Sequence, residues 1–500
     1  MLFRGAPSEM AEKLARVDQP FSIWTEGSSG ILAARDHLGI APMYYARGGP
    51  DGWTIATTVG EIIDRLPATG SRLDERAIVA HVAGLVPGPH ATFFSRIRAV
   101  EPGVLMRVTP ESIHSTPFWD PNHIEQRKGI ELESAADGLR DLIFEVVADH
   151  VDDRPVAVAL SSGLGSTIVL AALVEADADV EAITWTSPDV PESNEGRWAR
   201  LVARKLGVEL TELQMTVDEL LPETGVVTRR STPRFDPLDH MWRVTAGTVA
   251  DMGRRALYTG HGADRLFGGR IPAAADLLLA LRPGAVREHL ARKRIDEPGA
   301  HVRDELLGPI ARQIVPGLAR RRHKPVPWLD GSRRGVWQAI IRESTVSGML
   351  PGRALRISKL VGGEISQRSE ELTAQGRPDD VEIRQPLLDR RLVEFALGLP
   401  SWLIDDGRTD KLVLREAMRG VLPDEVIELE EIRSDAVIRE AMRTRGSQLL
   451  GLAHNTRSAD LGYVNEPLLF DRVASFLRGE HDDVSFWNAL TLEDWLRRWR

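Results

Sequence analysis

The chain has 500 residues, of which 42% are hydrophobic and 27% are charged, and it contains no cysteine. This composition is ordinary for globular proteins, and the length exceeds what one hydrophobic core supports, so we expect two or three domains. The net charge of −10 argues against a protein whose main task is binding nucleic acid through its phosphates. The absence of cysteine excludes disulfides, thiolate zinc sites and a cysteine nucleophile.

The N-terminal residues show no apolar signal-peptide core. No apolar run approaches the roughly 20 residues that span a bilayer. We therefore expect a cytoplasmic protein with neither a membrane nor a nucleic acid among its partners.

The first part of the chain is typical of short strands separated by turns. Apolar and β-branched residues predict strands over 21–25, 31–35, 43–45 and 53–57. Apolar residues at helical spacing predict helices over 73–86 and 130–151. We expect a small β-rich domain over residues 1–125.

From residue 154 onward, strands alternate with helices. Strands are predicted over 155–160 and 180–186, and helices over 166–176 and 196–206. This alternation predicts an α/β fold with a parallel sheet covered by helices on both faces. Beyond about residue 270 the sequence is mostly helical, and we assign residues 126–500 to one second domain.

A segment of small residues at 160–167 reads Leu-Ser-Ser-Gly-Leu-Gly-Ser-Thr. An apolar strand leads into it and an apolar helix follows, so backbone N–H groups and the helix dipole converge there. Small side chains let the backbone approach phosphate oxygens, and the hydroxyls of Ser161, Ser166 and Thr167 add donors. The segment predicts a phosphate site, and the alternative is a serine-capped helix after a glycine turn.

A second segment with the same character, at 257–269, reads Leu-Tyr-Thr-Gly-His-Gly-Ala-Asp-Arg-Leu-Phe-Gly-Gly. Asp264 is a candidate magnesium ligand, because hard cations take carboxylate oxygens together with substrate phosphates. A third segment at 381–389, Val-Glu-Ile-Arg-Gln-Pro-Leu-Leu-Asp, precedes Thr-Asp-Lys-Leu-Val-Leu-Arg at 409–415. Asp389 is expected to form hydrogen bonds with the backbone of its own turn, and we leave it out of the catalytic set.

Together these segments resemble the asparagine-synthetase family. The first is similar to its pyrophosphatase loop (Ser-Gly-Gly-x-Asp-Ser-Ser), the second to Gly-x-Gly-x-Asp-x-Leu-Phe-Gly-Gly, and the third to Glu-x-Arg-x-Pro-x-Leu-Asp with a downstream Lys-x-x-Leu-Arg. The closing Phe-Trp-Asn-Ala-Leu at 486–490 looks like the last helix of the family. The resemblance implies an adenine nucleotide α-hydrolase-like synthetase domain that uses ATP and Mg²⁺.

The segment 32–45 is similar to the glutaminase domain of the family, which hydrolyses glutamine with an N-terminal cysteine. The chain begins part-way into that domain and has no cysteine, so residues 1–125 are expected to be a truncated, degenerate N-terminal-nucleophile-like domain. Family members without a glutaminase use an amine of the substrate, as in β-lactam synthetase, carbapenam synthetase and the lasso peptide cyclases. Segments 259–262, 325–329 and 458–464 look most like the lasso peptide cyclases.

The resemblance implies that a side-chain carboxylate of a precursor peptide is adenylated and that the N-terminal amine of the peptide then closes a macrolactam ring. A leader-binding protein and a leader peptidase are the implied partners. A histidine beside a glutamate suits removal of a proton from the amine, so His261 and Glu382 are predicted to pair. The resemblance assigns catalysis to His261, Glu382 and Lys411, magnesium to Asp264, and ATP or pyrophosphate to Leu160, Ser161, Ser162, Gly163, Ser166, Thr167, Thr186, Gly260 and Gly262.

Two positions depart from the family pattern. Ser162 replaces a glycine, and Gly165 replaces an aspartate that helps to bind magnesium. Two alternatives to a lasso cyclase therefore stay open: another amide ligase, either of the β-lactam synthetase type or making asparagine from ammonia, and a catalytically impaired scaffold. Replacing Gly165 by Asp is expected to show whether the loop is a working variant or a relic.

Overall fold

The computed structural model describes most of the chain. The described residues are 6–27, 30–48, 52–66, 72–110, 112–191, 195–221, 232–269, 271–292, 302–314, 324–343, 350–429 and 435–499.

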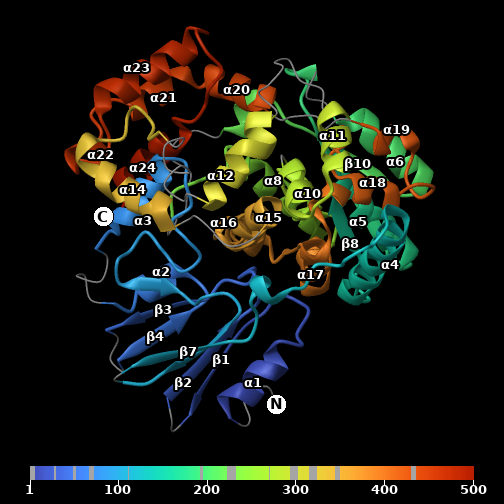
Figure 1. The fold of residues 1–500 in the computed structure, drawn as a ribbon. Coiled ribbons are helices and arrows are strands. Elements are labelled where there is room, and N and C mark those ends of the chain that lie inside the picture. Colours follow the sequence, from blue (N-terminus) through green and yellow to red (C-terminus); the bar gives the residue numbers. More distant parts are fainter. Residues whose placement is uncertain are drawn as a thin grey trace.

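The N-terminal part contains two antiparallel sheets, drawn in blue below the helical body in Figure 1. The four predicted strands are confirmed to within a few residues. The four-stranded sheet has the order β1 (Ser22–Gly27), β2 (Gly30–Arg35), β6 (Val104–Val108) and β7 (Ile113–Pro117), and the three-stranded sheet has the order β4 (Trp53–Ala56), β3 (Tyr44–Arg47) and β5 (Ile97–Ala99). Ala33 of β2 and Met106 of β6 form one small core with Met43 and Val100, which flank strands β3 and β5 of the other sheet.

Helix α3 (Glu75–Val82) joins the N-terminal part to the C-terminal helices. It begins after Asp74, whose carboxylate accepts a hydrogen bond from the Ala77 N–H at 3.0 Å. The helix packs against α14 (Arg334–Glu343) and α24 (Trp487–Arg498), and Phe94 contacts Trp495 in a shared core. The hydrophobic core is therefore continuous between the two ends of the chain.

The second part is built on a five-stranded parallel sheet, which confirms the predicted α/β class. The order is β10 (Leu210–Gln214), β9 (Val180–Thr186), β8 (Val156–Ala159), β11 (Ala256–Tyr258) and β12 (Glu382–Arg384). The chain runs outward from β8 to β10 and then returns to β11 on the other side of β8. Ligands of such sheets bind at the carboxyl ends of the strands where the order reverses, which here lies between β8 and β11.

Helices cover both faces of this sheet, because alternate residues of each strand point in opposite directions. Val156 and Val158 of β8 pack with α4 (Leu132–His150) and α5 (Leu164–Glu175). Ala157 and Ala159 pack instead with α8 (Asp239–Asp251) and α16 (Glu364–Gly376).

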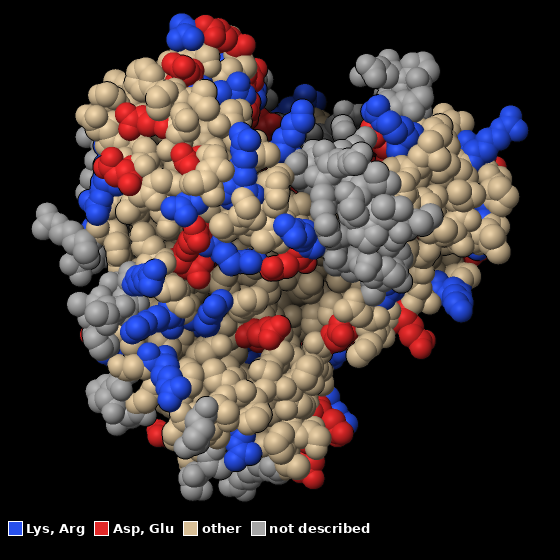
Figure 2. Space-filling model, turned by 60° about the vertical axis from the view of Figure 1, so that its left-hand side comes forward, with Lys and Arg blue, Asp and Glu red and all other residues tan. Residues whose placement is uncertain are grey.

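The rest of the chain is helical, as predicted beyond residue 270. No helix in the described ranges is long and apolar enough to cross a membrane. Basic and acidic side chains are interspersed on the face shown in Figure 2. The remaining helices are α1 (Pro7–Leu14), α2 (Val59–Ile63), α6 (Gly196–Leu206), α7 (Val217–Leu220), α9 (Ala263–Phe267), α10 (Ala273–Leu279), α11 (Pro283–Arg292), α12 (Gly308–Ile314), α15 (Pro351–Val361), α17 (Arg390–Gly398), α18 (Leu412–Ala417), α19 (Asp424–Ile427), α20 (Asp435–Thr444), α21 (Gly446–Leu452), α22 (Arg457–Asp460) and α23 (Glu466–Leu477).

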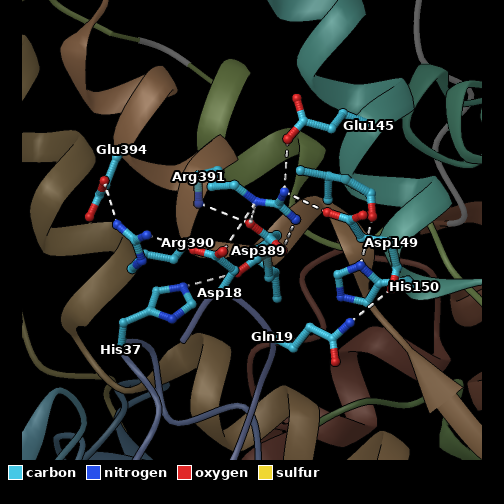
Figure 3. A network of polar contacts seen from close by, with 12 residues as sticks. Asp18, Gln19, His37, Glu145, Asp149, His150, Asp389, Arg390, Arg391 and Glu394 are labelled. Carbon is cyan, nitrogen blue, oxygen red and sulfur yellow. Dashed lines mark hydrogen bonds and ion pairs between the residues drawn. The ribbon is translucent and has the colours of Figure 1, made fainter. Parts of the chain in front are cut away.

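A polar network at the start of α17 ties the third sequence segment to α4 and to the N-terminal part (Figure 3). The buried carboxylate of Asp389 accepts a hydrogen bond from the Arg391 N–H at 2.9 Å, so Asp389 caps the helix as expected. Arg391 also reaches Asp149 of α4 at 2.6 Å, and Arg390 reaches Asp18 at 2.6 Å. These pairs fix the position of the third segment relative to the sheet.

Candidate nucleotide and pyrophosphate site

The first glycine-containing loop connects the central strand β8 to α5. The Leu160 N–H donates to the Ile183 carbonyl at 2.7 Å, so the strand pairing continues to the edge of the loop. Ser161, Ser162 and Gly163 form the turn, and α5 begins at Leu164. The predicted strand, turn and helix are therefore confirmed, and the amino end of a 12-residue helix faces the switch point of the sheet.

The hydroxyl groups of this loop are largely used within the loop itself. The Ser161 N–H donates to Ser166 Oγ at 2.9 Å, and the Gly163 N–H donates to Ser161 Oγ at 3.2 Å. Thr167 Oγ1 donates to the Leu164 carbonyl at 2.9 Å, inside the helix. In this structure Thr167 therefore supports the helix rather than offering its hydroxyl to a ligand, and Ser166 fixes the shape of the turn.

A carboxylate already faces the loop. The Ser162 N–H donates to Glu195 Oε2 at 2.8 Å, and Glu195 directly precedes α6. An anion is thus bound by the backbone at the carboxyl end of β8, as expected for a strand followed by a helix amino end. The residues of this loop fit a phosphate group, provided that Glu195 gives up this contact.

The second loop follows β11 and lies directly against the first. The Thr259 N–H donates to the Arg384 carbonyl at 3.0 Å, and Gly260, His261 and Gly262 lead into α9. Gly262 has φ +106°, and an added Cβ there would lie 2.7 Å from Leu388 Cδ2. A side chain at this position would be strained both by its backbone angle and by its neighbour.

Gly165 and Gly260 let the two loops touch through their backbones. A Cβ on Gly165 would lie 2.5 Å from the Gly260 carbonyl oxygen and 2.8 Å from Ala263 Cβ, and a Cβ on Gly260 would collide with Ser166. The position where the family has an aspartate therefore has no room for a side chain in this backbone. In this backbone an aspartate at 165 would first push the loops apart, so a loss of activity in Gly165→Asp would not by itself show that the loop is a relic.

Asp264 and Lys411 form an ion pair beside these loops. The Lys411 side chain is buried, whereas the Asp264 side chain is 63% exposed. Lys411 has φ +59°, and its side chain passes close to Gly268, where an added Cβ would lie 3.0 Å from Lys411 Cε. The predicted metal ligand and the predicted catalytic lysine are thus brought together.

The metal-binding capacity of this site is limited. The described residues contain no group of three or more histidine, aspartate or glutamate side chains that could hold a metal ion. Mg²⁺ is often bound by one or two carboxylates together with substrate phosphates, so Asp264 alone fits a magnesium that arrives with a nucleotide. Lys359 adds a second cation near the same edge. Its Nζ would lie 2.7 Å from a Cβ added to Gly269. Burial lowers the pKa of Lys359.

His261 is half-buried and lies next to Arg368, and not next to Glu382. Arg368 Nε donates to His261 Nε2 at 3.2 Å, and the Trp242 ring packs edge-on against the imidazole at 6.2 Å between ring centres. Burial, followed by the charges of Arg368 and Arg265, lowers the pKa of His261 to about 3. The imidazole is therefore neutral and accepts a hydrogen bond from Arg368.

Glu382 lies at the opposite end of the sheet. It pairs in register with Ala256, the first residue of β11, whereas His261 follows the last residue of that strand. Its exposed carboxylate accepts from Arg384 at 2.7 Å and lies 3.6 Å from Arg154. The predicted pairing of His261 with Glu382 is wrong, because parallel strands place these two residues at opposite ends.

The carboxyl end of β9 contributes further polar groups. Thr186 is the last residue of this strand, and a Cβ added to Gly196 would lie 2.8 Å from Thr186 Cγ2. The buried hydroxyls of Thr184 and Ser187 have no hydrogen-bond partner within the described part of the chain. Buried hydroxyls ordinarily have partners, so Ser187 is a candidate contact for a nucleotide at the end of β9.

Comparisons with known proteins agree with this geometry. The asparagine synthase family model matches residues 138–497. The chain belongs to the asparagine synthase family. A glutamine amidotransferase domain model also matches residues 11–119.

Three relatives illustrate the breadth of this asparagine synthase family. Asparagine synthetase [glutamine-hydrolyzing] 1 of Bacillus subtilis (strain 168) is 24% identical over 88% of this chain and 71% of its own length. Amidase chyE of Penicillium rubens is 23% identical over 82% of this chain and 68% of its own length. A putative asparagine synthetase [glutamine-hydrolyzing] of Mycobacterium bovis is 25% identical over 87% of this chain and 69% of its own length.

Sequence reasoning missed four residues of this asparagine synthase site. Glu195 and Arg368 lie in segments that contain no glycine-rich motif. Lys359 lies on a helix whose sequence gave no indication of a functional site. The sequence predicts that backbone groups of residues 183–187 contact the nucleotide, but it predicts no role for the Ser187 hydroxyl. The roles of the predicted site residues stay predictions, although most of these residues are brought to one edge of the sheet.

Proposed function

We propose that this member of the asparagine synthase family is an AMP-forming amide ligase that takes its amine from the substrate, as a lasso peptide cyclase does. In this proposal a side-chain carboxylate of a precursor peptide attacks ATP at the α-phosphate and pyrophosphate leaves. The N-terminal amine of the same peptide then attacks the acyl carbon, AMP leaves, and an isopeptide bond closes the ring. The observation that carries the proposal is the meeting of the two glycine-containing loops with the Asp264–Lys411 pair at the switch point.

The source of the amine is argued from composition. The 500 residues include no cysteine, so no residue of this chain can act as the thiol nucleophile of a glutaminase. The end of β2 and the loop after it nonetheless pack against the second part of the chain, because Arg35 donates to Ser366 Oγ and His37 Nε2 lies 3.0 Å from the Leu388 carbonyl oxygen. An amine supplied by the substrate removes the need for glutamine hydrolysis.

The residues of the site have distinct tasks in this proposal. The Ser162 and Gly163 backbone would bind the phosphates once Glu195 has moved. Bound magnesium would offset negative charge on the pyrophosphate, with Asp264 as its protein ligand. Lys411 would stabilise the same leaving group, since a buried ammonium interacts strongly with developing charge.

The partners implied by this proposal are a short precursor peptide, a leader-binding protein and a leader peptidase. Genes for these three components beside the gene for this chain would support ring closure. The direct test uses the precursor peptide with ATP and magnesium, followed by mass spectrometry. A product lighter by one water, formed together with AMP, is expected. A peptide that is recovered unchanged with ATP intact would contradict the proposal.

Two observations favour a second candidate, a catalytically impaired scaffold. Glu195 occupies an N–H of the phosphate loop, and Gly165 supplies no second carboxylate for magnesium. A scaffold would bind the precursor peptide without consuming ATP. Binding of the precursor to the chain with no AMP formed would favour this candidate over the ligase.

A further inference from the structure

A cavity of about 690 Å³ lies between the N-terminal part and helix α16. This volume is within the range of pockets that hold small organic ligands or short peptides, roughly 300–1,000 Å³. On one side its walls come from the first part of the chain, including Tyr44 and Val59. On the other side they come from α16 and the segment before α8, including Gln367 and Phe235.

Two carboxyl groups on α16, those of Glu370 and Glu371, line this cavity together with Arg35, Arg234 and Arg243. Glu371 Oε1 accepts a hydrogen bond from the Phe235 N–H at 3.1 Å, and Glu371 Oε2 lies 3.4 Å from Arg368. Glu370 also lines the cavity and bonds to the buried Tyr44 hydroxyl. Burial raises the pKa of both glutamates, that of Glu371 to about 8.

The charges near Glu371 leave a place for one more cation. Arg368 faces three carboxyl groups, those of Asp236, Glu371 and Asp239, and Asp239 lies 4.0 Å from Arg234. Among the described residues named here, three acids thus face two arginines, because the neighbouring His261 is neutral. A cationic ligand would balance the negative charge of the third carboxylate, that of Glu371. Without such a ligand, burial favours the protonated form of Glu371.

An anionic ligand is less well matched to these walls. The guanidinium of Arg35 already donates to the Gly39, Ala41 and Val100 carbonyls and to Ser366 Oγ. The guanidinium of Arg243 is paired with Asp379. Arg35 and Arg243 are therefore already engaged within the protein, and the third lining arginine, Arg234, lies 4.0 Å from Asp239.

Gln367 gives a second and independent indication of a ligand. It lines the cavity, and both its amide oxygen and its amide nitrogen are buried without a hydrogen-bond partner among the described residues. Leaving a donor and an acceptor unpaired costs free energy, and a peptide bond offers the matching acceptor and donor.

The side of the cavity that carries Glu371 is connected to the nucleotide site through Arg368. Arg368 contacts Glu371 on one side and His261 of the second loop on the other. Arg368 would therefore be the residue that separates a ligand bound by Glu371 from the second glycine-containing loop.

We propose that this cavity binds the amine end of a peptide, with the ammonium group against Glu371 and the first peptide bond against Gln367. The apolar walls, which include Val59 and Phe235, accept the side chain that follows. This inference rests on the proposed function, because a ligase that takes its amine from a peptide needs such a site.

The test measures binding of glycyl-phenylalaninamide to the full chain without ATP, by saturation-transfer NMR and calorimetry. N-acetylglycyl-phenylalaninamide, which lacks the ammonium group, is the matched ligand. The free amine is expected to bind at least about tenfold more tightly, a difference equivalent to about 1.4 kcal/mol. Equal binding of the two peptides, or no binding of the free amine, would overturn the inference.

Three variants locate the site. Glu371→Gln should weaken binding of the free amine to the level of the acetylated peptide, whereas Glu133→Gln, at an exposed position on α4, should leave it unchanged. Gly60→Leu adds a side chain where nothing lies within 4 Å, on a residue that lines the cavity, and should weaken binding of both peptides. This variant keeps the test decisive if Glu371→Gln fails to fold. Binding that none of these changes alters would place the peptide elsewhere.

Failure of this inference can be told apart from failure of the proposed function. Selective binding of the amine without AMP formation from any precursor would support the amine site and contradict the proposed ligase activity. Formation of AMP and the ring without selective amine binding would support the ligase activity and contradict the amine site.

Discussion

The Ser162 N–H donates a hydrogen bond to the carboxylate of Glu195 at 2.8 Å. A side chain of the protein thus occupies a backbone donor at which a nucleotide phosphate is expected. Because the contact joins an anion to the amino end of a helix, it competes directly with the phosphate for the same donor. The affinity of the loop for ATP should depend on how easily Glu195 withdraws.

Replacing Glu195 by Gln should strengthen nucleotide binding. The amide carries no charge, so it competes less well for the Ser162 N–H and does not repel the phosphates. We expect the dissociation constant for ATP to fall by roughly tenfold, measured by calorimetry. Glu209→Gln is the matched control, because Glu209 is exposed and precedes β10, at the amino end of that strand and away from the loop. Weaker ATP binding in the Glu195 variant would mean that this carboxylate assists the nucleotide instead.

Replacing Gly165 by Asp should destabilise the fold rather than restore a metal ligand. The new Cβ would lie 2.5 Å from the Gly260 carbonyl oxygen, and overpacking of this kind costs about 1–3 kcal/mol. Denaturant unfolding is the measurement. Gly335→Ala on α14 is the control, since an added Cβ there meets nothing within 4 Å and should be neutral or stabilising. An active, equally stable Gly165→Asp enzyme would show that the two loops separate easily.

Replacing Lys411 by Gly should abolish most activity without disturbing the backbone. Lys411 has φ +59°, which glycine adopts without strain, so the variant removes the whole side chain, including its ammonium group, without straining the backbone. If Lys411 offsets charge on the leaving pyrophosphate, AMP formation should fall by roughly 100-fold or more. Lys411→Ala should lose the same activity and be less stable than Lys411→Gly. Full activity of the glycine variant would remove Lys411 from the mechanism.

The stability of the protein should fall as the pH drops from about 6.5 toward about 3. Burial lowers the pKa of His81 and of His261 from 6.5 to about 3, so both histidines are neutral in the folded protein. The unfolded chain takes up protons in this window and the folded chain does not, which lowers the free energy of unfolding as the pH falls.

Urea unfolding of the His81→Gln variant tests this pH dependence. The variant should lose less stability than the wild type between about pH 7 and about pH 4. His123→Gln is the control, because the His123 side chain is 86% exposed. A pH dependence identical in all three proteins would contradict the assignment.

Much of the fold could be predicted from the sequence, because its signals are local. The apolar strand before Leu160 and the glycines around His261 predicted both strand-to-loop transitions. Three-residue strands such as β5 and β12 carry too little periodicity to be predicted. Their position is set by tertiary pairing.

The candidate site was predicted less completely, because its decisive contacts join distant segments. Asp264 and Lys411 were predicted to share one site, and they do. The partner of His261 was not predicted, since Arg368 lies on α16, more than 100 residues further along the chain. The Gly165–Gly260 contact was also missed, because only the packing of two loops shows that no aspartate fits.

The measurement that tests the central claim most directly is exchange of labelled pyrophosphate into ATP in the presence of magnesium and the precursor peptide. An AMP-forming ligase should exchange label when the carboxylate-bearing peptide is present, and should lose this exchange when the acceptor Asp or Glu of the peptide is replaced by its amide. Lys411→Gly should exchange little or no label. Release of ADP and phosphate, or the absence of any peptide-dependent exchange with ATP bound, would contradict the claim that this chain activates a carboxylate as its adenylate.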